Sequence, residues 1–494
     1  MPGVANPHEL LNFANGDWVK PGATSFLEFR NPASGEVLGR VPDSSPADVD
    51  AVVRSAAAAF PQWRRTPPEE RIQYLFKMKD VLERNFELIA RTTTIENGKT
   101  INESRGELRR AIENVEVACG IPTLMQGYNL EDVASGIDEI MIRQPLGVVA
   151  AITPFNFPTM IPFWFLPYAI ACGNTFILKP SEKVPLSSEL IFKLMSEIGL
   201  PKGVLNLLNG SRAAVDGLLQ HPQVKAISFV GSTNVARYIY SEAAKYGKRV
   251  QCQGGAKNHA VIAPDADLEM ATKIVSDSAF GCAGQRCLAV SVTIAVGDAQ
   301  KEFTERLVKT ASAINVGNGL EESVHMGPVI TGESKQRIES LIAVGEKDGG
   351  KLLLDGRRHG SSKNGGNFLG PTLFADVPAA SAVATQEVFG PVLNVLRVDT
   401  LDQAIDIIAA NPYGNAASIF TSSGALARKF RYEAPTGNIG VNIGVAAPMA
   451  YFPFSGWKDS FLGVLHGQGR DAVQFYTEQK VVVERWPKDW SRKF

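Results

Sequence analysis

The chain has 494 residues, of which 45% are hydrophobic and 20% charged, a balance typical of a soluble globular protein. Its 50 Lys and Arg residues almost equal its 51 Asp and Glu residues, so the net charge of −1 indicates neither nucleic acid nor an anionic membrane as a partner. The length exceeds what one hydrophobic core usually supports, so we expect two or three domains.

The N-terminal residues and the cysteines indicate the compartment. The first nine residues contain no basic segment followed by an apolar one, so we expect no secretory signal. The most apolar run, residues 160–172, contains two prolines and is too short to cross a bilayer. The 5 cysteines are scattered without metal-ligand spacing, which predicts a reduced, cytoplasmic protein without disulfides or a bound metal.

The first 143 residues predict strands, then helices, then an arm. Strand-like stretches occur at residues 10–19 and 28–41, and Ser44 or Ser45 is expected to cap a helix. Amphipathic patterns at residues 69–101 and 103–120 predict further helices. Residues 128–143 are polar and then alternate, which is typical of a hairpin arm that joins subunits, and residues 480–484 form a strand-like tail. We therefore expect a homo-oligomer.

A regular alternation of apolar stretches and helical patterns begins at residue 147 and starts again after residue 254. Apolar strands that alternate with helices imply parallel sheets covered on both faces, with ligands beyond the carboxyl ends of the strands. The chain is therefore expected to contain two α/β units. Strands are expected at 148–152, 175–178, 204–208, 226–230 and 249–252, then at 259–263, 290–296, 351–354, 373–377, 392–398 and 417–420. Helices are expected at 159–172, 187–198, 213–219 and 235–246, then at 267–279, 301–314, 401–410 and 425–432.

A candidate nucleophile lies in residues 280–289, Phe-Gly-Cys-Ala-Gly-Gln-Arg-Cys-Leu-Ala. Cys287 is placed where a loop after a helix leads into a strand, a usual position for a presented nucleophile. The adjacent Arg286 can lower the pKa of the thiol below its free value of about 8.5 and so populate the thiolate. Taken alone, a cysteine in apolar surroundings is more often a small core residue.

The predicted strand ends of the first unit carry polar and turn residues, at positions 153–158, 179–182 and 231–233. The last of these, Gly-Ser-Thr, opens a helix and can present backbone N–H groups to an anion such as a pyrophosphate. The alternative is that its hydroxyls only cap the helix. The dinucleotide fingerprint Gly-x-Gly-x-x-Gly is absent from the sequence, which argues against an ordinary Rossmann site.

Six short motifs resemble, in order and spacing, the aldehyde dehydrogenase superfamily over residues 30–480. They are Asn156 in Pro-Phe-Asn-Phe-Pro, Lys179 in Lys-Pro-Ser-Glu, Gly231-Ser232-Thr233, Gly-Gln-Arg-Cys ending at Cys287, Glu387 in Glu-Val-Phe-Gly-Pro, and residues 453–458, Pro-Phe-Ser-Gly-Trp-Lys. The resemblance makes a core role for Cys287 a minor alternative.

This resemblance implies an α/β fold with two Rossmann-like parallel-sheet domains and a small β oligomerisation arm. An NAD-binding domain would comprise residues 1–127 and 144–254, a catalytic domain residues 255–470, and the arm and tail residues 128–143 and 471–494. A homotetramer is implied as well. The residues implied to bind NAD are Thr153, Phe155, Lys179 and Glu182 (the last two at the adenosine ribose), Gly231 and Ser232 at the pyrophosphate, Glu387 at the nicotinamide ribose, and Phe389 near the nicotinamide.

The chemistry expected at this site starts with the Cys287 thiolate, which adds to an aldehyde and forms a tetrahedral oxyanion. The Asn156 side-chain amide and the backbone N–H of Cys287 would donate hydrogen bonds to that oxygen, and one such donor is typically worth about 3–4 kcal/mol. Hydride transfer to NAD would leave a thioester on Cys287.

The sequence departs from the family pattern where that thioester is released. Hydrolytic members carry a glutamate that activates water, but the matching position here is Gln253, in Gln-Gly-Gly-Ala-Lys. An amide cannot act as a general base near neutral pH. A second acid that the family often carries is also replaced, since Arg470 falls near its position. A thiol is therefore the expected acceptor.

Gln253, together with Arg286 directly before the nucleophile, resembles the CoA-acylating, methylmalonate-semialdehyde dehydrogenase branch of the superfamily. Arg110 matches a second arginine of that branch by its distance from Cys119, although Arg109 competes with it and a solvated helix face is the alternative role. Two guanidinium groups suit a substrate that carries a carboxylate beside its aldehyde. In that branch the carboxylate leaves as CO2, and CoA takes acetyl or propanoyl from the cysteine.

We therefore expect NAD-dependent, CoA-acylating oxidation of malonate semialdehyde or methylmalonate semialdehyde, with CoA as co-substrate. Glu182, an acid near the ribose hydroxyls, favours NAD over NADP. The first alternative is a hydrolytic NAD(P)-dependent aldehyde dehydrogenase that acts on another substrate. A catalytically silent member of the superfamily and a cysteine-dependent acyl transferase without redox chemistry are further alternatives.

Overall fold

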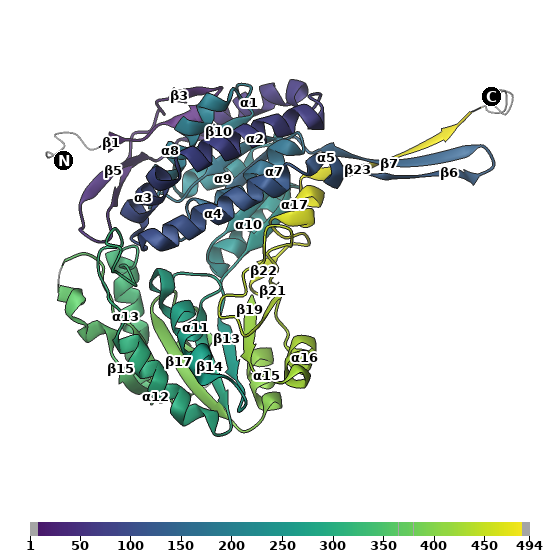
Figure 1. The fold of residues 1–494 in the computed structure, drawn as a ribbon. Coiled ribbons are helices and arrows are strands. Elements are labelled where there is room, and N and C mark those ends of the chain that lie inside the picture. Colours follow the sequence, from purple (N-terminus) through teal and green to yellow (C-terminus); the bar gives the residue numbers. More distant parts are fainter. Residues whose placement is uncertain (1–7, 364, 379, 487–494) are drawn as a thin grey trace.

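The computed structural model describes residues 8–363, 365–378 and 380–486. Figure 1 shows two α/β bodies, each built on one large sheet, and a narrow β ribbon that projects from the first body. The two sheets correspond to the two units expected from the alternating pattern.

The first sheet has eight strands in the order β22-β12-β11-β8-β9-β10-β2-β3. Its five central strands are parallel, and every residue of β8 and β9 is buried, which explains their continuous apolar sequences. The strands are β8 (Val148–Ile152), β9 (Thr175–Lys179), β10 (Leu205–Leu207), β11 (Val224–Val230) and β12 (Arg249–Gln253), with antiparallel additions β2 (Asn12–Ala14), β3 (Asp17–Val19) and β22 (Phe461–Leu462). The polar strand ends predicted to bind the cofactor therefore share one edge of this sheet.

Helices cover both faces of the first sheet (Figure 1). Of the two predicted caps, Ser44 and Ser45, it is Ser45 that caps α1, through a capping box with Asp48. The single pattern at residues 69–101 is in fact two helices, because the chain bends at Asn85 and α3 ends at the left-handed Gly98. The helices are α1 (Pro46–Trp63), α2 (Pro68–Arg84), α3 (Phe86–Asn97), α4 (Ile101–Ala118), α5 (Ile121–Leu124), α6 (Met160–Phe163), α7 (Leu166–Ala171), α8 (Leu186–Met195), α9 (Arg212–Gln220) and α10 (Thr233–Lys245).

The second sheet has seven strands in the order β15-β16-β17-β14-β13-β19-β20, and only β15 is antiparallel to its neighbour among the described strands. The strands are β13 (Asn258–Ile262), β14 (Val290–Val296), β15 (Lys351–Leu354), β16 (Thr372–Ala375), β17 (Val392–Val398), β19 (Ala416–Phe420) and β20 (Asn438–Val441). The helices are α11 (Leu268–Phe280), α12 (Ala299–Ser312), α13 (Gly332–Lys347), α14 (Ala382–Thr385), α15 (Leu401–Ala410) and α16 (Gly424–Glu433). Helix α13 and strand β20 were not expected from the sequence.

The chain returns to the first body near its C-terminal end. Strand β22 pairs with β12, so the predicted catalytic segment 255–470 includes one strand of the first sheet. Helix α17 (Gly469–Phe475) then packs near α4, α5 and α7 of the same body, so residues 471–475 of the predicted tail are helical. This crossing places C-terminal residues beside the loops that follow β8 and β12.

The projecting ribbon consists of β6 (Tyr128–Ala134), β7 (Ile137–Pro145) and β23 (Thr477–Arg485). The expected hairpin is present, and β23 pairs with β7 along its whole length, from Thr477 opposite Pro145 to Arg485 opposite Ile137. Residues 487–494 of the predicted tail lie outside the described residues. Within the described chain, no helix combines the length and the apolar character needed to cross a bilayer.

Candidate active site

The loop between α11 and β14 presents Cys287. Cys282 and Ala283 adopt left-handed backbone conformations, with φ values of 49° and 52°, and so does Gly284. A Cβ on Gly284 would lie 2.1 Å from the carbonyl oxygen of Gly390, so only glycine fits this close approach. The carbonyl of Cys287 accepts hydrogen bonds from the side-chain amides of Asn258 (2.8 Å) and Asn415 (2.7 Å). The second body therefore holds the nucleophile's backbone.

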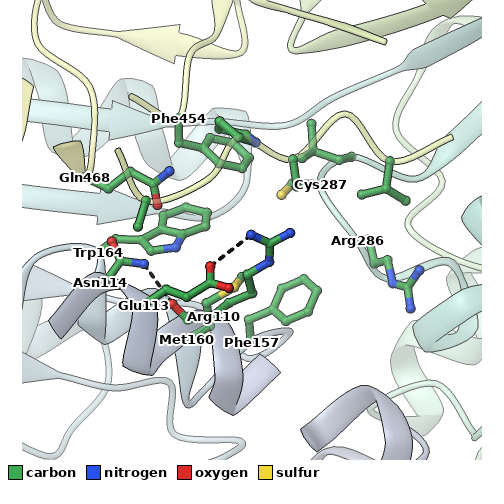
Figure 2. Close-up of a pocket in the computed structure, with 15 residues that line it drawn as sticks. Arg110, Glu113, Asn114, Phe157, Met160, Trp164, Arg286, Cys287, Phe454 and Gln468 are labelled. Atoms are coloured by element: carbon green, nitrogen blue, oxygen red, sulfur yellow. Dashed lines mark hydrogen bonds and ion pairs between the residues drawn. The ribbon is translucent and has the colours of Figure 1, made fainter. Parts of the chain in front are cut away.

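Cys287 opens into a pocket between the two bodies (Figure 2). Aromatic and aliphatic side chains form most of its wall, and a few polar groups enter it from α4 and from the segment before α17. The lining residues are Arg110, Glu113, Asn114, Phe157, Met160, Trp164, Arg286, Cys287, Leu288, Val445, Ala447, Pro448, Ala450, Phe454 and Gln468. Such a combination suits a small substrate with one charged group.

Asn156 is buried in the loop that follows β8, and its side-chain amide donates to the carbonyl of Gln285 at 3.1 Å. The amide therefore lies against the nucleophile loop, two residues before Cys287. This position is compatible with the predicted role of Asn156 as an oxyanion donor.

The expected lowering of the Cys287 thiol pKa is wrong for the protein without ligands. Burial raises the pKa of Cys287 to about 12, and the negative charge of Glu387 raises it further. Backbone hydrogen bonds and the nearby Arg286 act in the opposite direction but do not compensate. The thiol of Cys287, a partly exposed residue, is thus held neutral until its surroundings change.

The guanidinium of Arg286 points away from the pocket that contains Cys287 and Arg110 (Figure 2). It forms an ion pair with Glu103 at 3.0 Å and donates to the sulfur of Cys282 at 3.3 Å. The predicted contact of Arg286 with a substrate carboxylate therefore requires the side chain to leave Glu103, and it stays a prediction.

Arg110 lies in the pocket, whereas its competitor Arg109 pairs with Glu83 at 2.6 Å and is not among the lining residues. Arg110 forms an ion pair with Glu113 at 2.9 Å, and its side chain is 38% exposed. The geometry thus favours Arg110 over Arg109 for the predicted substrate contact. Glu113 was not expected from the sequence, although its spacing of three residues from Arg110 on one helix was the available signal.

Five of the predicted cofactor-binding residues meet at the carboxyl ends of β8, β9 and β11. The backbone N–H of Thr153 donates to the carbonyl of Lys179 at 3.1 Å, and the Lys179 ammonium lies 3.4 Å from the carboxylate of Glu182. Gly231 and Ser232 precede α10, and within the described chain Ser232 makes no side-chain capping bond. The N-terminus of α10 is therefore open to an anionic ligand.

The other predicted cofactor-binding residues lie nearer to Cys287. A carboxylate oxygen of Glu387 accepts from the backbone N–H of Ala256 at 2.9 Å, and burial raises the pKa of Glu387 to about 7. Phe389 has a left-handed φ of 50° and packs edge-to-face against Phe155, with 5.8 Å between the ring centroids. The structure thus brings the predicted set together along one route from α10 to Cys287.

Gln253, at the end of β12, is 5% exposed, and neither its amide nitrogen nor its amide oxygen has a hydrogen-bond partner among the described residues. A buried amide without partners is costly, which is typical of a group that meets a ligand or water in the working protein. Arg470 is exposed on α17. Neither of these two positions therefore carries a carboxylate.

Comparison with known proteins places this geometry in a class. The family model described as the aldehyde dehydrogenase family matches residues 18–482, so the chain belongs to the aldehyde dehydrogenase family and has its fold. Malonate-semialdehyde dehydrogenase 2 of Geobacillus kaustophilus (strain HTA426) is 50% identical over 477 residues, which cover 97% of this chain and 99% of that protein.

Two solved structures are similarly close. Methylmalonate-semialdehyde dehydrogenase from Oceanimonas doudoroffii is 43% identical, with a TM-score of 0.96 over 98% of this chain and 100% of that chain. A Sinorhizobium meliloti 1021 protein, provisionally named methylmalonate-semialdehyde dehydrogenase and complexed with NAD, is 42% identical, with a TM-score of 0.96 over 99% of this chain and 100% of that chain.

Proposed function

We propose that this protein oxidises malonate semialdehyde or methylmalonate semialdehyde with NAD, releases CO2, and transfers the acyl group to CoA. The main support for this substrate class is the position of the Arg110 guanidinium, which lies in the same pocket as Cys287. A cation at this place can hold the carboxylate of the semialdehyde while the thiol reaches its aldehyde carbon. The names of the similar proteins support the same substrates.

NAD fits the residues at the carboxyl edge of the first sheet. The open N-terminus of α10 at Ser232 suits a pyrophosphate, and Glu182 beside Lys179 suits ribose hydroxyls. Glu387 and Phe389 would hold the nicotinamide end. When bound, NAD accepts the hydride that leaves the substrate carbon.

The remaining steps belong to the side chains of this chain. The thiolate of Cys287 bonds to the aldehyde carbon, and the oxyanion accepts hydrogen bonds from the Asn156 amide and the Cys287 backbone N–H. Loss of hydride leaves an acyl thioester that still carries the substrate carboxylate. Cleavage of the bond to that carboxylate releases CO2, and a proton replaces it on the α carbon. The CoA thiolate then attacks the thioester carbon and frees the Cys287 thiolate.

CoA is the proposed acceptor because Gln253 cannot remove a proton from water. The alternative, a hydrolytic dehydrogenase of another substrate, needs a different base near Cys287. We also place the protein in the cytoplasm as a homotetramer. Five free cysteines support the reducing compartment, and the exposed ribbon of β6, β7 and β23 supports the oligomer.

The deciding experiment measures NADH formation from malonate semialdehyde with and without CoA, together with CO2 release. We expect repeated turnover only with CoA, and acetyl-CoA and CO2 as products. Steady turnover without CoA that gives a free dicarboxylate would refute the proposal.

The Gln253→Glu variant tests the same point from the opposite side. A carboxylate at residue 253 can act as a general base, so we expect CoA-independent turnover to rise by about 10- to 100-fold, up to the lower limit of the usual contribution of general-base catalysis. Gln253→Asn, which restores no base, is the matched control. An unchanged dependence on CoA in Gln253→Glu would show that residue 253 does not decide the acceptor.

A further inference from the structure

A fully buried ion pair joins Lys99 to Glu107 beside the candidate active site. The two charged atoms are 2.5 Å apart, and the side chains are 1% and 0% exposed. Lys99 lies in the turn between α3 and α4, and Glu107 lies on α4. Neither residue belongs to the set that the sequence singled out.

Both members of the pair hold the segment that carries Asn156. The Lys99 ammonium donates to the backbone carbonyl of Asn156 at 2.6 Å and lies 4.1 Å from the ring centroid of Phe157. One carboxylate oxygen of Glu107 accepts from the backbone N–H groups of Thr159 (2.7 Å) and Met160 (3.0 Å). The pair therefore fixes the backbone on both sides of Phe157.

The turn that carries Lys99 is itself held firmly. The backbone N–H of Ile101 donates to the carbonyl of Gly319 at 2.7 Å, and a Cβ on Gly319 would lie 2.2 Å from the carbonyl oxygen of Lys99. The side chain of Asn97 donates to the carbonyl of Phe155 at 2.8 Å. Contacts from the second body and from α3 thus leave little freedom at this turn.

Stability alone does not explain such a pair. Removing two charges from water costs so much that well-packed apolar residues of similar volume often stabilise a protein as well or better. An oxyanion donor, in contrast, must be held within about 0.5 Å of its productive position. A buried pair with three backbone contacts on one short segment provides that precision.

We propose that Lys99 and Glu107 are positioning residues that set the Asn156 amide for the oxyanion formed on Cys287. This inference rests on the role of Asn156 in the proposed function but not on the identity of the substrate or on CoA. It can therefore be tested with propanal, an aldehyde without a carboxylate, by the first-turnover burst of NADH.

The main variant is Lys99→Met/Glu107→Gln, which removes both charges and leaves none unpaired. The glutamine oxygen can still accept from Thr159 and Met160, whereas methionine cannot donate to the Asn156 carbonyl. We expect the NADH burst to slow by about 10- to 100-fold, less than the loss typical of deleting an oxyanion donor. The dissociation constant for NAD is expected to stay unchanged.

The matched control is Lys79→Met/Glu116→Gln. This pair also joins a lysine to a glutamate of α4, at 2.6 Å, but it is 39% and 42% exposed and does not contact the Asn156 segment. Its burst is expected to equal that of the wild type. Should the main variant fail to fold, Glu107→Asp alone is the test, because it keeps a carboxylate opposite Lys99 but shortens its reach to Thr159 and Met160, and a smaller slowing is expected.

An Asn156→Ala background separates positioning from general damage. If the pair acts through the Asn156 amide, adding Lys99→Met/Glu107→Gln to Asn156→Ala slows the burst no further. The inference would be overturned if Lys99→Met/Glu107→Gln slowed the burst of Asn156→Ala by the same factor as it slows that of the wild type. A wild-type burst rate in the folded Lys99→Met/Glu107→Gln variant would overturn it as well. A wild-type burst in Asn156→Ala would overturn the role of Asn156 itself, while a CoA-independent wild type would refute only the proposed acceptor.

Discussion

The thiol of Cys287 shows how burial and charge oppose each other at a single residue. Its pKa is raised to about 12 by burial and by Glu387, although the permanent cation of Arg286 is next to it in sequence. The Arg286 guanidinium is directed to Glu103 and Cys282 instead. A charged residue that is adjacent in sequence therefore need not place its charge next to the thiol.

This opposition predicts the reactivity of Cys287 in the protein without ligands. Below the thiol pKa, its alkylation by iodoacetamide should rise about tenfold per pH unit up to pH 10, because only the thiolate reacts. Glu387→Gln removes a charge that disfavours the thiolate, so its alkylation at pH 8 should be about three- to tenfold faster, as expected for a pKa shift of up to one unit. Peptide mapping must separate Cys287 from the half-buried Cys119, and a rate independent of pH between 7 and 9 would contradict the raised pKa.

Arg110 predicts a split between two substrates. Arg110→Leu removes the pocket guanidinium, so kcat/KM for malonate semialdehyde should fall about 10- to 100-fold, the range of a charge-assisted hydrogen bond. Turnover of propanal, which has no carboxylate, should be almost unchanged. Arg109→Leu is the control because Arg109 pairs with Glu83 outside the pocket. Equal losses with both aldehydes would assign Arg110 to structure rather than to the substrate.

The sequence could identify residues whose chemistry lies in a short motif, such as Cys287 and Asn156. It could not identify Lys99 and Glu107, because their backbone partners, Asn156 and Thr159, lie 57 and 52 residues away from them along the chain. A lysine and a glutamate eight residues apart are also common on exposed helices, and only the fold shows that these two are buried.

At the scale of elements, the extent of burial determines which strands and helices can be recognised from the sequence. Strands β8 and β9 were predictable because all their residues are buried and apolar. Helix α13 was not, because only Ile338, Ile342 and Gly345 among its residues are buried, and so narrow a stripe gives a weak periodic signal. The break at Asn85 was hidden because the apolar stripe continues from α2 into α3.

The junction of α3 with α8 predicts a dependence of stability on pH. Burial raises the pKa of Glu96 from 4.5 to about 8, while its carboxylate oxygens accept from the backbone N–H groups of Leu186 (2.6 Å) and Ser187 (2.9 Å). Between these pH values the folded protein keeps a proton that the unfolded chain loses. The contribution of Glu96 to stability is therefore complete below about pH 4.5 and is lost as the pH rises through about 8.

Glu96→Gln should weaken this dependence, because a glutamine stays neutral at every pH and can still accept one of the two hydrogen bonds. The thermal midpoint of the variant should fall less than that of the wild type between pH 6 and 8.5, by roughly 1 °C for each kcal/mol involved in a chain of this length. Differential scanning fluorimetry at matched ionic strength measures the thermal midpoints of both proteins at each pH. Parallel curves for the two proteins would show that Glu96 is ionised in the folded state throughout this range.

At the scale of the whole molecule, the two sheets could be predicted, but their connection could not. Strands β12 and β22 pair although the whole second body lies between them in the sequence. Nothing in the sequences of these two strands predicts that they pair. The same return path brings Phe454 and Gln468 into the pocket with Cys287. The substrate pocket is therefore a product of the complete fold rather than of either unit.

One face of the projecting ribbon carries several exposed apolar side chains. The register places Tyr128 and Val481 on opposite sides of Met141, and Leu130 and Val483 on opposite sides of Glu139. Four apolar side chains thus share one face, and they are 70% (Tyr128), 61% (Val481), 63% (Leu130) and 62% (Val483) exposed. Contiguous apolar surface of this kind usually marks a protein interface, which supports a second copy of the chain as its cover in the proposed tetramer.

This interface predicts that one charge can separate the subunits. Leu130→Lys places an ammonium in the apolar face, where it would be buried unpaired on assembly, so sedimentation velocity should show a smaller species than the wild type. Asn129→Lys adds the same charge to the opposite face of β6 and should leave the assembly unchanged. Since no residue of β6, β7 or β23 lines the Cys287 pocket, the first-turnover burst of the dissociated Leu130→Lys protein should stay close to that of the wild type. An unchanged assembly in Leu130→Lys would exclude this face of the ribbon as the interface.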